Sequence, residues 1–163
     1  KVMGQIKNLD SASARGERNV SVGLTDASAK LLLKGFDFNA RATLGSVLNT
    51  SYSVDAGTGT VTLSSFNPME QLRAAEGATH FSLQVGYLNL NFETGESDLT
   101  LSPESVFPLV QGVISPVLTP SGVPAGSGVG MHVMLLEFFQ EVNGVQYMLN
   151  NGAYNVLNLL EVQ

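Results

Sequence analysis

The chain of 163 residues contains no cysteine and no tryptophan, and only 13% of its residues are charged. Without cysteine, a disulfide, a thiolate nucleophile and a cysteine-ligated metal are all excluded. The charged fraction is about half of the usual ~25% of soluble domains. Because charge is low while glycine is frequent, with 17 residues, the composition favours a β-rich protein with many turns over a helical bundle.

Lysine and arginine are absent after Arg73. All eight basic residues lie in the first 73 positions beside six acids, whereas residues 74–163 hold eight acids. The C-terminal half should therefore repel nucleic acids and anionic membranes, which proteins bind through lysine and arginine. The N-terminal half is too weakly basic to compensate, so we expect no nucleic-acid partner.

Long apolar runs are also absent. No stretch of 18 apolar residues occurs, so no membrane-inserted helix is expected. The chain opens at Lys1, and Val2, Ile6 and Leu9 follow at helical spacing. We expect a helical N-terminal extension over residues 1–34 that continues a longer precursor. In a fragment of a precursor, a missing signal peptide gives little information about localisation, so no localisation is predicted.

The chain is organised around one apolar stretch near its C-terminus. Residues 131–139 carry a single charge and read as a strand buried on both faces. Asn143 and Gly144 follow, and this pair is typical of a type I′ turn because both central positions of that turn need positive φ. Residues 145–149 should return against the strand, and residues 154–162 should form another strand.

The longest alternating run covers residues 79–92. Its apolar residues change parity next to Gly86, which predicts a β-bulge or a strand that crosses between sheets. Eight or so short strands with regular turns indicate a mainly β domain over residues 35–163. The predicted fold is an antiparallel two-sheet β-sandwich of immunoglobulin-like or jelly-roll type, with the helical extension before it.

Reactive residues are sparse. His80 and His132 lie 52 positions apart. We expect each to be a strand histidine that is hydrogen-bonded locally; the alternative is that it is a metal ligand.

Phe138 and Phe139 are adjacent, so they point to opposite faces of a strand. If both faces are covered, both rings are core; if one face is open, one ring lies in an apolar patch suited to a partner.

Two groups of residues are candidate contact sites. Loops at one end of the sandwich would hold a carbohydrate or peptide, with these first candidates: Asn150, Asn151, Tyr154 and Gly128. The segment from Val113 to Leu118 contains proline, so it can form only an edge strand or an interrupted strand. An edge strand can pair with another chain.

Several segments resemble an uncharacterised family of Bacteroidota proteins with a C-terminal all-β domain: IKNLDSASARGERNV, LLLKGFDFN, EGATHFS and FFQEVNGVQYMLNNGAYNVL. The resemblance covers nearly the whole chain, and FFQEVNGVQY is its most specific part. Family members carry a further Gly-rich, basic N-terminal region. The resemblance implies a bacterial source, and because the family has no established activity it implies no catalytic residue.

The sequence therefore predicts a non-enzymatic structural or protein-interaction module, with self-assembly as one version of it. We expect a protein partner or self-association and no cofactor or bound metal. The alternative is a carbohydrate- or peptide-binding β-sandwich module, with a glycan as its ligand.

Overall fold

The computed structural model describes residues 1–163 and is mainly β, with two antiparallel sheets and a few short helices. The strands are β1 (Phe36–Asp37), β2 (Tyr52–Val54), β3 (Val61–Leu63), β4 (His80–Leu90), β5 (Ser97–Leu101), β6 (Ser105–Pro108), β7 (Val117–Leu118), β8 (Val129–Val142), β9 (Val145–Met148) and β10 (Val156–Val162). The helices are α1 (Val2–Asn8), α2 (Val20–Gly23), α3 (Ala27–Leu33), α4 (Leu44–Val47), α5 (Pro68–Gln71) and the 3₁₀ helix η1 (Leu149–Gly152).

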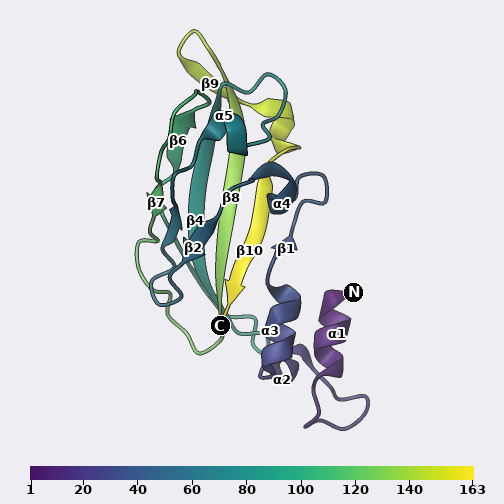
Figure 1. Cartoon of the computed structure of the whole chain (residues 1–163). Helices are drawn as coiled ribbons and strands as arrows, with labels where there is room; N and C mark the ends of the chain where they lie inside the picture. The colour runs from purple at the N-terminus through teal and green to yellow at the C-terminus, as the bar shows by residue number, and fades with distance from the viewer.

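The two sheets face each other across one hydrophobic core, which confirms the predicted β-sandwich. The seven-stranded sheet has the order β1-β10-β8-β4-β5, with β6 also paired to β4 and β9 to β8; the other sheet has the order β2-β3-β7. Figure 1 shows the small sheet in front of the long strands β4 and β8. The core between them contains these buried side chains among others: Val61, Leu63 and Leu118 of the small sheet, and Phe81, Leu83, Met134, Leu136 and Phe138 of the large one.

The predicted hairpin near the C-terminus is confirmed. β9 pairs with the end of β8, and Asn143 and Gly144 have φ of 54° and 77°, as a type I′ turn requires. The expectation that the strand is buried on both faces is wrong for much of β8. Its residues alternate between fully buried positions facing the core and half-buried positions such as Leu135 and Phe139 on the other face.

The β-bulge predicted at Gly86 is absent. β4 pairs with β8 in one unbroken register from His80 opposite Phe139 to Leu90 opposite Val129. The apolar parity changes because the far side of the sheet is covered at this end only. Leu88 there packs against the N-terminal helices, so apolar residues are needed on both faces.

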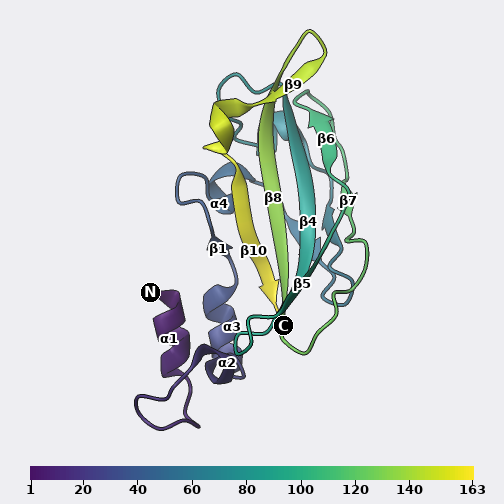
Figure 2. The same ribbon diagram turned by 180° about the vertical axis from the view of Figure 1, so that it is seen from behind.

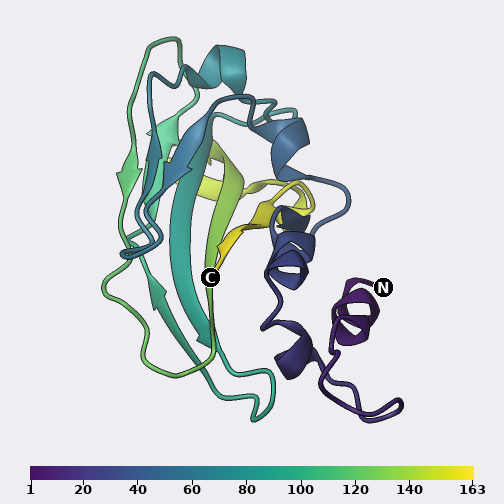
Figure 3. The ribbon, with the colours of Figure 1, turned by 60° about the horizontal axis from the view of Figure 1, so that its bottom comes forward.

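The N-terminal helices α1, α2 and α3 lie within residues 1–34 and build a second, smaller core. Ile6, Leu24 and Leu33 pack there against Met131 and Leu159 of the large sheet. Figure 3 shows these helices beside the sandwich, on the side away from the small sheet. The extension is therefore anchored on the sheet through its apolar side chains.

Asp10 organises the loop that joins α1 to α2. Its carboxylate accepts hydrogen bonds from the backbone N–H groups of Ala12, Ser13 and Asn19 at 2.9–3.0 Å. Burial opposes ionisation of Asp10, but the hydrogen bonds from Ser13 and the backbone outweigh it and lower its pKa to about 2. The loop is thus held by an ionised side chain at neutral pH.

Candidate functional site

The face of the large sheet that points away from the core is the candidate site, and we call it the outer face. Strand register places Leu101, Gly86, Val133, Leu159 and Phe36 in one row across β5, β4, β8, β10 and β1. Paired residues of neighbouring strands project from the same side of a sheet. The row therefore runs across the outer face from one edge to the other.

Apolar side chains dominate this row and the positions next to it. We call the following set the apolar stripe: Phe36, Phe38, Leu99, Leu101, Val133, Leu135 and Leu157. Leu99, Leu101 and Phe38 keep exposed fractions of 51%, 44% and 58%. Figure 2 shows the strands of this face in front, with α1, α2 and α3 at one end only.

The stripe is contiguous because glycine stands at its centre. A Cβ atom at Gly86 would lie 3.0–3.2 Å from side-chain atoms of Val133, Leu101 and Leu99, so these three side chains converge over the glycine. At the other edge the rings of Phe36 and Phe38 pack edge to face with centroids 5.1 Å apart. Side chains from β1, β5, β8 and β10 thus form one apolar surface, with Gly86 of β4 at its centre.

A half-buried carboxylate lies on the outer face between Leu135 and the β8–β9 hairpin. Glu137 is half-buried on β8, and Oε1 accepts a hydrogen bond from Nδ2 of Asn155 at 2.7 Å. Burial, and then the charge of Glu104, raise the pKa of Glu137 above its ordinary value. The ionised form of Glu137 is therefore disfavoured in the folded protein.

We expect Glu137→Gln to stabilise the protein at neutral pH, because the amide oxygen can still accept from Asn155 while the disfavoured charge is removed. With a raised pKa, the contribution of Glu137 to stability is full below the unfolded pKa of about 4.3 and is lost as pH rises through the folded pKa. The Tm should rise by about 1–2 °C at pH 7 and by nothing near pH 4. Thermal unfolding followed by circular dichroism at both pH values is the measurement, and an equal gain at both would contradict this explanation.

The two histidines lie at separate places. His80 is on the outer face, with Nδ1 3.0 Å from Oγ1 of Thr79 and Nε2 3.6 Å from the carboxylate of Glu141. His132 is buried, and its ring lies tilted against that of Tyr87 with centroids 4.2 Å apart. Burial lowers the pKa of His132. Because Tyr87 is seven positions along β4 from His80, about 23 Å separate the two rings along the strand, and they form no joint site.

The loop residues expected to bind a ligand together are not brought together. Asn150 and Asn151 lie in η1 with φ of 48° and 52°, and Tyr154 follows them. Gly128 lies before the first residue of β8, at the opposite end of that strand, where β4 passes close to its backbone. The length of β8 keeps the two groups about 30 Å apart.

The proline-rich segment forms an edge, as predicted. β7 pairs only with β3, so its other side has no strand partner. Val113 is 66% exposed, whereas Leu118 is buried in the core. The strand has only two residues and Pro116 precedes it, and short strands with proline are poor templates for pairing with another chain.

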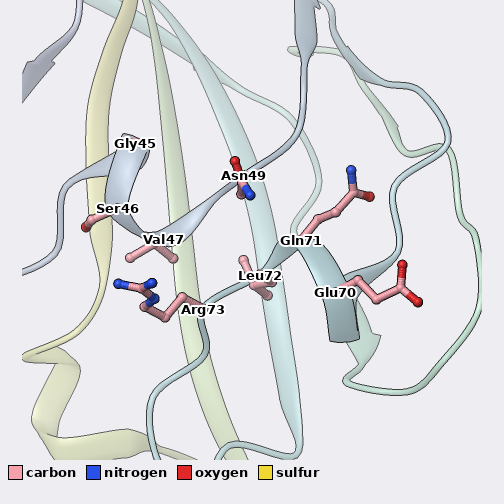
Figure 4. Close-up of a pocket in the computed structure, with 8 residues that line it drawn as sticks. All are labelled: Gly45, Ser46, Val47, Asn49, Glu70, Gln71, Leu72 and Arg73. Atoms are coloured by element: carbon pink, nitrogen blue, oxygen red, sulfur yellow. The ribbon is translucent and has the colours of Figure 1, made fainter.

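A shallow depression of about 460 Å³ lies between α4 and α5. Its polar backbone groups bond to each other, with Asn49 N donating to Gln71 O at 2.7 Å and Arg73 N to Val47 O at 2.8 Å. Figure 4 shows the side chains of Glu70 and Arg73 directed away from each other. Nothing in this depression converges on a ligand.

No group of three or more His, Asp or Glu side chains could hold a metal ion. No helix has the length and apolar character needed to cross a membrane.

Comparisons with known protein families, with characterised proteins and with solved structures found no match. The resemblance to the Bacteroidota family stays a prediction.

The residues of the apolar stripe were not among the site residues predicted from the sequence. A signal was available in the alternation of Phe36 with Phe38 and of Leu99 with Leu101. In a β-strand such alternation marks one apolar face, but whether that face is covered depends on the other elements of the fold.

Proposed function

We propose that the protein is a non-enzymatic protein-interaction module that contacts another protein surface through the apolar stripe of its outer face. The observation that carries this proposal is the exposure of apolar side chains from four strands, β1, β5, β8 and β10, and from the neighbouring Phe38 on one side of the molecule. Contiguous apolar surface of this extent costs solubility unless a partner covers it, so such patches mark interaction sites.

The low charge of this surface supports the same function. Across the stripe the sheet presents leucine, valine and phenylalanine, and no member of the stripe carries a charge. Interface cores are depleted in charge and enriched in aromatic residues. Phe36 and Phe38 are the aromatic anchors that this type of contact uses.

The carbohydrate- or peptide-binding alternative has less support. The residues expected to line its site are divided between the two ends of β8, and Asn150 and Asn151 serve a tight turn with positive φ.

Photocrosslinking tests the proposed function. We expect p-benzoylphenylalanine in place of Leu135 to give one discrete protein adduct in the native host, because this position lies inside the stripe. The same amino acid in place of Ser53, which is exposed on β2 of the opposite sheet, is the matched control and should give none. Equal adducts at both positions, or no adduct at position 135, would contradict the proposal.

A further inference from the structure

We infer that the partner on the outer face is a second copy of this chain, packed face to face and antiparallel about a two-fold axis that runs across the strands. The inference rests on the proposed function of the outer face and names its partner. Three features of the structure carry it: the size of the face, the separation of charge between its ends, and the position of the N-terminal helices.

The size of the outer face fits a weak dimer interface. The N-terminal helices cover the end of β4 that begins at Leu88, so the open part of this strand runs from His80 to Gly86. Four strands spaced about 4.8 Å apart, with about 3.3 Å per residue over this length, give an open face of about 440 Å². A stable interface of standard size buries about 800 Å² on each partner, and transient complexes bury less. Two sheets also pack readily through their faces, as the two sheets within this sandwich do. The open face therefore has the area of a weak, reversible homodimer.

One end of the molecule is basic. Residues 1–34, which contain α1, α2 and α3, hold six basic and three acidic residues. Lys7, Arg15 and Arg18 line a depression of about 560 Å³ that includes no acid. None of these three side chains belongs to either ion pair of the chain, which are Lys34 with Glu161 and His80 with Glu141. We call this region the basic end.

The other end of the outer face is acidic. Residues 35–163 hold two basic and eleven acidic residues. Glu137 and Glu141 share the parity of Leu135 on β8, so both project from the outer face toward the β8–β9 hairpin. Glu104 lies close enough to Glu137 to raise its pKa. We call this group the acidic end.

Charge and shape select the antiparallel arrangement. If the two sheets packed with their strands parallel, the two basic ends would meet at one side and repel. With antiparallel strands, the basic end of each copy lies beside the acidic end of the other, and the same contact is made twice, as two-fold symmetry requires. The helices of each copy then project past the opposite end of its partner. Leu135, at the middle of β8, lies close to the axis.

Introduced cysteines test this geometry directly, because the chain has none of its own. Purified protein should sediment as a dimer at micromolar concentration. A bismaleimide should link Leu135→Cys to itself and should not link the control Ser53→Cys. Arg15→Cys and Glu141→Cys should each remain unlinked alone and should link to each other when mixed. Self-linkage of Arg15→Cys would overturn the antiparallel arrangement.

Charge reversal gives a second readout. Arg15→Glu and Glu141→Lys should each weaken the dimer about tenfold, and an equal mixture of the two variants should recover the original affinity because the reversed charges again face opposite charges. A mixture no tighter than its components would contradict the pairing of the two ends.

The outcome also separates this inference from the proposed function. If the purified protein stays monomeric at about 100 μM while position 135 crosslinks to a different protein in the host, the inference of a second copy is overturned and the interaction module stands. We expect a dissociation constant in the micromolar range, because an interface of this size is typical of transient complexes. If the purified protein is monomeric and position 135 gives no adduct, both are overturned.

Discussion

Phe138→Ala is expected to destabilise the protein by about 3–5 kcal/mol, the usual cost of removing a fully buried phenylalanine ring. Phe138 is 1% exposed and stands opposite Phe81 in the register of β8 and β4. Phe81 in turn packs edge to face on Phe66, with ring centroids 5.9 Å apart. The substitution opens a cavity between the two sheets, where neighbouring strands hold the surrounding side chains in place.

Such a loss is a large part of the total stability of a domain, which is about 5–15 kcal/mol. Urea unfolding followed by circular dichroism is the measurement, and the midpoint should fall with little change in slope. Phe139→Ala is the matched control, since Phe139 is the next residue on the same strand but is only half-buried on the outer face. It should cost about 1 kcal/mol. Equal losses for the two variants would contradict the assignment of faces.

Gly23→Ala is expected to displace α1 from the sandwich. A Cβ atom at Gly23 would overlap the backbone carbonyl of Ile6, and backbone cannot turn aside as a flexible side chain can. Ile6 is fully buried in the second core, so movement of α1 loses that burial. We expect a cost of about 1–3 kcal/mol, the range for overpacking, confined to the N-terminal extension.

Limited trypsinolysis measures this displacement selectively, because lysine and arginine are absent after Arg73. Cleavage after Lys7 should be faster in Gly23→Ala than in the original chain. Gly4→Ala is the control, since a Cβ at Gly4 meets nothing within 4 Å. It lies inside α1 and should slow cleavage by stabilising the helix by about 0.5–1 kcal/mol. Faster cleavage of both variants would show that α1 is not held by the contact with Gly23.

Local signals in the sequence predicted most of the strands and the helices of residues 1–34. The hairpin at Asn143 and Gly144 was predicted because only a few residue types accept positive φ at both central positions of the turn. The information for this turn lies within about ten residues of chain.

Burial on the outer face was predicted less well, because it depends on elements that are distant in the sequence. The change of parity beside Gly86 was interpreted as a bulge in β4 or as a strand crossing between sheets, but its cause is the packing of the N-terminal helices on Leu88. Phe139 was placed in the core if both faces were covered, and the structure leaves its face open. The loop site failed for the same reason, since only the pairing of β8 shows that Gly128 and Asn150 lie at its opposite ends.

The sequence by itself determined the class of fold, since alternating apolar residues, turn-forming pairs and low charge require strands that bury one face. It also determined the charge of the two parts of the chain, because charge follows from composition alone. The tertiary structure decided which of the two faces of each strand is covered. That depends on long-range packing: three short helices cover one end of the outer face and leave the apolar stripe, from Phe36 to Leu101, without a cover in the single chain.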